Sequence, residues 1–429
     1  MKLRITILYI AFLLLAISAN AQQNEDTLRR IPSSHFTIGG YGEAVYSRHM
    51  YSDNVFRYSF ADRYADSRGH SQVDIPHMVI MMGYDFGHGW TMGSEIEFEH
   101  GGTECAVELE SEETGEYEKE IERGGEVALE QFWIQKSWGR GLNLRMGHDV
   151  VPVGATNAAH LPSQYFGVYR PEGEATILPC TWHATGVSVW GRIGAWRYGV
   201  WLIPSLNSTL FSVSNWAGGA SASPYEFTVA NRLALASRVD YYVTQGVRIG
   251  VSGFVGNTFN NDIVTDEFSN KYSNVKALML FGSIDFSIER GRFTARGNLD
   301  YGHLNDAAKV SAYNSTLSNS SQSPYPHTLV GEEAVDAALE LGWNWINPSS
   351  DKQFVTFARC DYYDSYIPVA GLTEYGWAKR MCWSVGANYR PVKEVILKAE
   401  VGMRQLQKQY NSEPWVALGV TYAGLFKSN

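Results

Sequence analysis

Three glutamates at every second position, Glu95, Glu97 and Glu99, have the spacing that most clearly indicates a shared chemical role. Alternate side chains of a β-strand point to the same face, so this spacing predicts a ladder of carboxylates on one face. The apolar Ile96 and Phe98 then point to the other face. A row of like charges on one wall can attract, repel or orient a polar solute without breaking any bond.

Basic residues at alternate positions of other segments supply the opposite charge. They are Arg145, Arg232, Arg238, Arg248, Arg292 and Arg296. Segment 150–181 adds Arg170, Glu172 and Glu174, which either select a solute or belong to an ordinary Pro-Gly turn at 170–173. The sequence has no G-x-S-x-G motif and no His/Cys spacing typical of zinc. We therefore expect no catalytic residues, no metal site and no cofactor.

The segments that carry these residues have the pattern of β-strands. Between residues 334 and 345, apolar Val335, Leu339 and Leu341 alternate with Asp336 and Glu340. Strict alternation of this kind predicts a strand with one apolar and one polar face. Similar segments recur through the chain, and helical periodicity is nearly absent after the N-terminus.

The connections between these segments alternate in length. Seven tight turns are expected at 87–89, 139–141, 191–194, 243–246, 289–291, 347–352 and 391–394. A long connection rich in Ser, Asn, Gly, Pro or Glu lies on either side of each turn, which makes eight long connections and 16 strands. Short turns at one end and long loops at the other are typical of transmembrane antiparallel barrels. We therefore predict an all-β, transmembrane β-barrel over residues 34–426, with short periplasmic turns and long external loops.

A barrel of this size reverses the usual meaning of the two strand faces. The apolar face contacts lipid, and the polar face lines a water-filled lumen. The glutamate ladder would lie on the third strand, and Arg292 and Arg296 on the eleventh, which is the opposite wall. The two walls would then set up a transverse field across the lumen, unless the arginines pair locally with inward carboxylates. The inward face of the strand at 354–363 stays open.

The N-terminus predicts export. Lys2 and Arg4 precede an apolar stretch at 5–17 and a small-residue cleavage site at 19–21, which indicates a signal peptide over residues 1–21. Residues 22–33 would then form a periplasmic segment, and residues 427–429 a C-terminal tail. The net charge of −10 argues against a nucleic-acid partner.

Two further groups of residues allow more than one interpretation. In an oxidising compartment the four cysteines could pair as Cys105/Cys180 and Cys360/Cys382, or stay free as small apolar residues. Segment 104–126 holds ten glutamates. It could bridge lipopolysaccharide through divalent cations, but charge runs more often form solvated loops.

One hairpin resembles the phosphate-selective porin family of outer-membrane barrels. The resemblance rests on residues 132–136 (FWIQK), 139–141 (GRG) and 142–147 (LNLRMG), followed by 151–154 (VPVG). The opening at 38–43 (IGGYGE) also resembles the first strand of bacterial porins. The resemblance implies a 16-stranded porin, usually a homotrimer, that passes small solutes by diffusion. It also implies that loop 150–181 folds into the lumen as a constriction.

Two functions fit these patterns. The first is an outer-membrane porin for small polar or charged solutes, related to anions or phosphate through the family resemblance. The second is a surface-binding or adhesion scaffold that uses the external loops. In both, the partners include outer-membrane lipid and lipopolysaccharide, and an enzyme is not expected.

Overall fold

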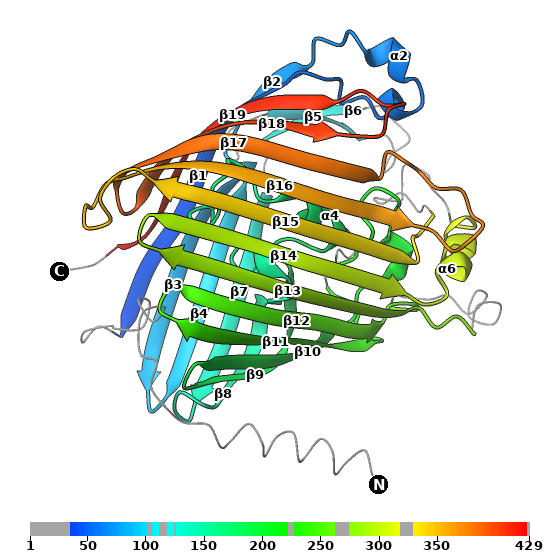
Figure 1. Cartoon of the computed structure of the whole chain (residues 1–429). Helices are drawn as coiled ribbons and strands as arrows, with labels where there is room; N and C mark the ends of the chain where they lie inside the picture. The colour runs from blue at the N-terminus through cyan, green and yellow to red at the C-terminus, as the bar shows by residue number, and fades with distance from the viewer. Residues whose placement is uncertain are drawn as a thin grey trace.

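Sixteen strands form a closed antiparallel barrel in the computed structural model of the chain (Figure 1). The structure describes residues 35–100, 105–110, 118–123, 126–221, 227–261, 274–317 and 329–426. The barrel strands are β1 (Phe36–His49), β3 (His77–Gly87), β4 (Trp90–Glu99), β7 (Glu126–Ser137), β8 (Asn143–Val150), β9 (His183–Ile193), β10 (Trp196–Pro204), β11 (Leu233–Thr244), β12 (Val247–Asn257), β13 (Leu278–Arg290), β14 (Phe293–Leu304), β15 (Glu333–Asn344), β16 (Gln353–Ile367), β17 (Lys379–Val392), β18 (Val395–Gln405) and β19 (Glu413–Phe426). β19 closes the ring on β1, with Ile38 opposite Phe426 and His49 opposite Trp415. The prediction of a 16-stranded antiparallel barrel is confirmed.

The seven predicted tight turns join β3–β4, β7–β8 and the five later hairpins, all at one end of the barrel. Glycines with positive φ, such as Gly246 (74°) and Gly291 (59°), form two of these turns, where a residue with Cβ would be strained. The other end carries the long connections. Smaller elements in these connections are β2 (His70–Asp74), which extends the sheet beside β1, η2 (Val55–Tyr58), α2 (Ala61–Tyr64), the hairpin β5 (Cys105–Glu110) and β6 (Glu118–Arg123), η4 (Ser208–Leu210) and α6 (Ala307–Asn314).

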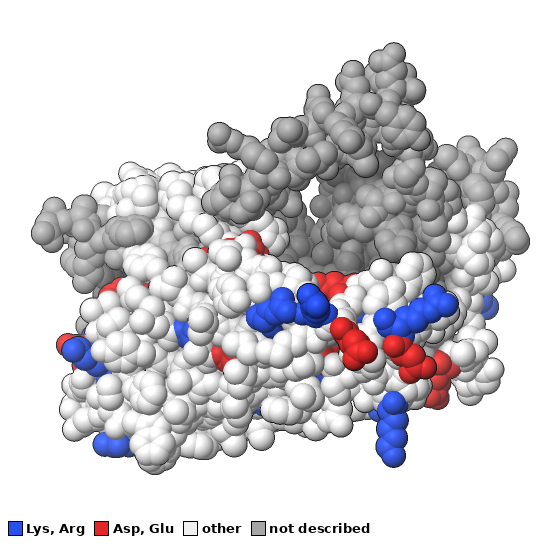
Figure 2. Space-filling model, turned by 90° about the horizontal axis from the view of Figure 1, so that it is seen from above, with Lys and Arg blue, Asp and Glu red and all other residues white. Residues whose placement is uncertain are grey.

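The outer wall is apolar. On β15, Leu339, Leu341 and Trp343 are about two-fifths exposed, whereas Asp336 and Glu340 are buried inside. Other strands repeat this inversion of a soluble core, and Figure 2 shows large uncharged areas on the face it presents. The belt of apolar side chains matches the hydrocarbon layer of an outer membrane. No helix in the described part of the chain is long and apolar enough to cross a membrane.

Arginine in place of Leu339 should lower the free energy of unfolding by about 2–4 kcal/mol, because a charge near the bilayer midplane loses its hydration. The neighbouring Ala338 shares the inner face of β15 with Asp336 and Glu340, so Ala338→Arg is the matched control and should have little effect. Urea unfolding of the barrel in lipid vesicles measures both changes. Equal effects of the two substitutions would contradict the assignment of faces.

The outer half of the lumen differs from the expected polar wall. Residues 205–221 fold inward and place Phe211 and Trp216 against Met279, Phe281 and other buried apolar side chains of β11–β15. The indole of Trp216 also donates to the carbonyl of Gly331 at 3.1 Å. Here the inward face is therefore a packed apolar core rather than a wet wall.

β16 places Arg359 and Asp361 inside the barrel, which resolves the face that the sequence left open. Cys360 lies opposite Trp383 on the outer face, and Cys382 is buried on the inner face, so these two thiols cannot pair. Cys180 is also free. The sequence had left pairing open, and neither proposed disulfide is present at these three residues. The predicted signal peptide, the segment 22–33 and the tail 427–429 lie outside the described residues.

Candidate pore and its inward segment

The connection between β8 and β9, residues 151–182, lies inside the ring of strands and contains α3 (Ala155–Ala158) and α4 (Glu172–Ile177) (Figure 1). Inward side chains of distant strands bind its backbone. Ser252 of β12 accepts from the amide of Gly154 at 2.9 Å. Glu400 of β18 accepts from the amide of Val168 at 2.8 Å. The segment therefore crosses the lumen and contacts the opposite wall.

Two buried cations hold the middle of this segment. The Lys398 ammonium of β18 donates to the carbonyls of Pro162, Tyr165 and Gly167 at 2.6, 3.1 and 2.8 Å. Arg359 of β16 donates to the carbonyl of Tyr169 at 2.9 Å. Carbonyl groups buried without donors would destabilise the fold, so these cations fix the path of the backbone.

Glu172, at the start of α4, is anchored to the wall. Arg404 donates to its two carboxylate oxygens at 2.7 and 2.9 Å, and Arg380 lies 3.6 Å away. The Tyr363 hydroxyl also donates to it. The two guanidinium groups outweigh the effect of burial and lower the pKa of Glu172 to about 2.

The other two predicted loop residues also bind protein groups. Glu174 accepts from the amides of Ala155 and Thr156 at 2.8 and 2.6 Å, while burial holds its pKa well above the usual range. Arg170 donates to the Thr181 hydroxyl at 2.8 Å. Like Glu172, these side chains position the segment, and none of the three belongs to the described lining of the cavity below.

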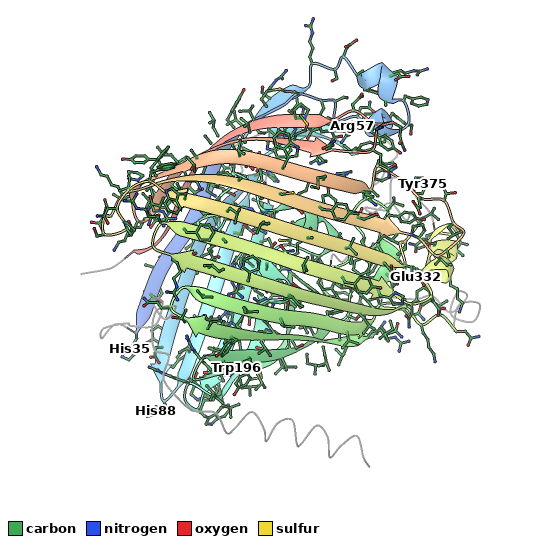
Figure 3. All side chains as sticks on the ribbon, viewed as in Figure 1. His35, Arg57, His88, Trp196, Glu332 and Tyr375 are labelled. Atoms are coloured by element: carbon green, nitrogen blue, oxygen red, sulfur yellow. The ribbon has the colours of Figure 1, made fainter. Side chains whose placement is uncertain are left out.

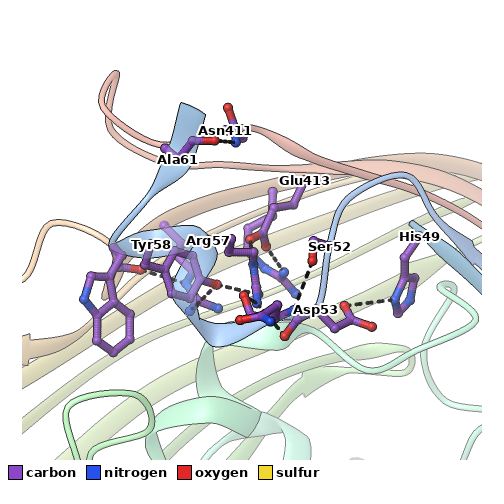
Figure 4. Close-up of polar contacts among 12 residues, drawn as sticks. His49, Ser52, Asp53, Arg57, Tyr58, Ala61, Asn411 and Glu413 are labelled. Atoms are coloured by element: carbon purple, nitrogen blue, oxygen red, sulfur yellow. Dashed lines mark hydrogen bonds and ion pairs between the residues drawn. The ribbon is translucent and has the colours of Figure 1, made fainter. Parts of the chain in front are cut away.

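A loop at the long-loop end of the barrel joins the same network of charged side chains. Arg57 of η2 donates to Glu413 of β19 at 2.7 Å (Figure 4). Glu413 in turn accepts from Arg404, which binds Glu172. Asn411 donates to the carbonyl of Ala61 at 2.8 Å. The loop over β19 and the segment inside the barrel are thus connected through alternating charges.

A cavity of about 990 Å³ lies between the inward segment and the short-turn end of the barrel. In Figure 3, His88 and Trp196 mark the short-turn end, and Glu332 and Tyr375 mark the long-loop end. The described lining includes eight arginines against four carboxylates. The arginines are Arg145, Arg197, Arg238, Arg248, Arg292, Arg296, Arg359 and Arg390, and the carboxylates are Asp149, Asp240, Glu289 and Glu340. The lining has a formal excess of four positive charges, which Asp285 and Glu400 behind it partly offset through ion pairs with Arg238, Arg248 and Arg359.

Several of these arginines do pair locally, which the sequence had left as an alternative. Arg238 and Arg248 share Asp240 and Asp285, with nitrogen–oxygen distances of 2.7–2.9 Å. Arg145 binds Asp149 at 2.8 Å. By contrast, the described part of the chain gives no ion pair to Arg197, Arg292 or Arg390. Their charge is available to a solute.

The glutamate ladder lies elsewhere. Glu95 and Glu97 are buried on the inner face of β4. The Glu97 carboxylate forms a hydrogen bond with His77, with 2.5 Å between Oε1 and Nδ1. Glu99 is half-buried at the long-loop end of the strand. None of the three belongs to the described lining of the arginine-rich cavity. A field between the ladder and the arginines therefore does not act across that cavity.

The structure corrects the prediction that Arg232 lines the pore. It precedes the first residue of β11 and is exposed at the long-loop end, so alternation along the strand does not apply to it. Arg292 is exposed at the rim of the cavity, and Arg296 lies deeper, 3.5 Å from Glu340. Arg197 was missed. The outward Val200 and Leu202 of β10 place odd-numbered positions inside, so alternation would have found it.

No protein-family model matches the chain. A curated uncharacterised protein from Aquifex aeolicus is 23% identical over 370 residues, which span 85% of this chain and 74% of that protein. Among solved structures, the outer membrane channel DcaP of Acinetobacter baumannii matches with a TM-score of 0.51 and 11% identity, covering 91% of this chain and 97% of that chain. OmpF of Salmonella typhi, solved with daunomycin, matches with a TM-score of 0.52 and 10% identity over the same shares. The fold is that of an outer-membrane porin.

Proposed function

We propose that the chain is an outer-membrane channel through which small polar or charged solutes diffuse passively, with a preference for anions. The arginine-rich cavity carries this proposal. An excess of positive charge near a narrow aqueous path attracts anions and repels cations. Phosphate is one candidate among these anions, through the resemblance of the β7–β8 hairpin.

We further propose that residues 150–181 form the constriction. Hydrogen bonds from three distant strands, β12, β16 and β18, support this role, because they hold the segment across the lumen. The proposal includes a homotrimer in contact with lipopolysaccharide and outer-membrane lipid. Gel electrophoresis of unheated and heated samples measures the oligomeric state.

Ion selectivity tests the preference for anions. A unit charge about 4 Å from an ion contributes roughly 1 kcal/mol in water, so removing two free arginines should reduce selectivity several-fold. The double variant Arg292→Gln/Arg390→Gln removes two charges of the cavity lining that have no carboxylate partner among the described residues. The zero-current potential across a KCl gradient measures the anion-to-cation permeability ratio.

Arg290→Gln is the matched control, because Arg290 lies in the same hairpin as Arg292 but is exposed and outside the cavity lining. Wild type and this control should both favour chloride. A cation-selective wild type, or a double variant with an unchanged ratio, would refute the role of these arginines.

A further inference from the structure

Four carboxyl groups meet where α4 contacts the barrel wall, behind β15 and β16 in Figure 1. They are Glu174 of α4, Asp300 of β14, Asp336 of β15 and Asp361 of β16, with exposed fractions of 1, 5, 3 and 0%. One oxygen from each of Glu174, Asp300 and Asp336 lies within 4.8 Å of the other two. Carboxylates buried together repel one another and require a compensating charge or proton.

The protein satisfies only part of this cluster. Asn298 donates to Asp300 at 2.7 Å and also to Asp336. The Gly173 amide donates to Asp361 at 2.8 Å. The remaining oxygens, Asp300 Oδ1, Asp336 Oδ1 and Asp361 Oδ1, are buried without a hydrogen-bond partner. Over the described ranges, no lysine, arginine or histidine forms an ion pair with any of the four carboxyl groups.

Two of the unsatisfied oxygens converge on one place. A Cβ atom added to Gly173 would lie 1.9 Å from Asp336 Oδ1 and 2.5 Å from Asp361 Oδ1. Asp361 lies farther from this group of three, and its buried Oδ1 without a hydrogen-bond partner is a separate observation that points toward the same place. The unsatisfied atoms all belong to carboxyl groups, so this partner must be a cation or a proton donor.

We infer that Glu174, Asp300 and Asp336 bind one divalent cation that prefers oxygen ligands, with Asp361 beside the ion and with Ca²⁺ favoured over Mg²⁺. Calcium–oxygen distances are roughly 2.3–2.6 Å, so ligands on opposite sides of the ion can lie up to about 5 Å apart. The oxygens of Glu174, Asp300 and Asp336 lie within this span of one another. Mg²⁺ requires shorter, near-ideal octahedral contacts, which ligands from a helix and two strands do not readily supply. The lack of nitrogen and sulfur ligands disfavours zinc.

The site would join the inward segment to the wall. Glu174 also binds the amides of Ala155 and Thr156, so an ion held by this carboxylate would fix both α3 and α4 to β14 and β15. Thr156 and Asn298 lie on the lining of the large cavity, which gives an ion a route to the cluster. The residues are far apart in the sequence, which is why no motif predicts the site. This inference does not depend on the proposed channel function.

Calcium binding by the purified, folded full-length protein tests the inference in detergent free of lipopolysaccharide. Equilibrium dialysis with radioactive Ca²⁺ should show one ion bound per chain at this site, and thermal unfolding should shift upward with Ca²⁺ relative to EDTA. Asp300→Asn/Asp336→Asn should reduce affinity more than about tenfold, because fewer charged ligands remain. The same variant should lose the thermal shift. Asp351→Asn, in an exposed turn, should retain both responses.

Two results would overturn the inference. One is a wild type that binds no Ca²⁺ and shows no thermal shift. The other is binding that persists in the double variant, which would place the ions elsewhere, for example at the glutamate-rich segment 104–126. If the double variant does not fold, Asn298→Ala takes its place, since it removes a donor to two ligands and keeps all four carboxylates. It should weaken binding by about 10- to 100-fold, and unchanged affinity would count against the site.

Discussion

Replacing Lys398 with methionine will lower the free energy of unfolding by about 3–5 kcal/mol and increase the conductance of the barrel. The ammonium group is buried and donates to three carbonyls of the inward segment. Methionine fills a similar volume but donates no hydrogen bond, so three buried acceptors and the nearby Glu400 carboxylate lose a positive partner. The segment around Pro162–Gly167 should then move away from β18 and widen the path.

Urea unfolding in lipid vesicles gives the stability change, and single-channel recording gives the conductance. Lys393→Met is the matched control, because Lys393 is exposed in the β17–β18 turn. The control should behave as wild type. A Lys398→Met protein with wild-type stability and conductance would show that these hydrogen bonds do not hold the segment.

Acid should release the inward segment by protonating Glu172. Its pKa is about 2 in the folded protein and about 4.5 as an ordinary carboxyl group, because Arg404 and Arg380 stabilise the charged form. A lowered carboxyl pKa contributes stability that is present above pH 4.5 and is lost as the pH falls through 2. The shift corresponds to up to about 3 kcal/mol.

The Glu172→Gln variant separates this group from other carboxylates. Its stability at pH 7 should already be lower by up to about 3 kcal/mol, and it should lose less between pH 4.5 and pH 2 than wild type does. Unfolding by urea across this pH range measures the difference. Glu394→Gln, exposed in a turn, should keep the wild-type pH profile. Parallel profiles for wild type and Glu172→Gln would contradict the assigned role of this ion pair.

Much of the barrel could be predicted from the sequence, because lipid outside and water inside impose opposite chemistry on alternate residues. Leu339 and Glu340 differ in polarity for this reason, and the glycine turns end the strands where the pattern predicts. The pattern fails where the inner face is not wet. Phe254 and Phe281 point inward and pack under residues 205–221, so the alternation of apolar and polar side chains disappears in the outer half of β12 and β13.

The candidate site was less predictable, since alternation gives a face but neither depth nor partners. Alternation placed Arg238 and Arg296 inside the barrel, but it could not show that Arg238 forms ion pairs with Asp240 and Asp285. It also failed for Arg232, which lies beyond the strand end. The pairing of Glu172 with Arg404 joins residues more than two hundred positions apart, and no local pattern encodes such a contact.

Single-channel recording of the purified wild-type protein in a planar lipid bilayer tests the central claim most directly. We predict stable, ohmic current steps after insertion, because the charged cavity of about 990 Å³ gives ions and water a polar space inside the barrel. A folded barrel that inserts into the bilayer and carries no current would contradict the channel function and favour a surface scaffold.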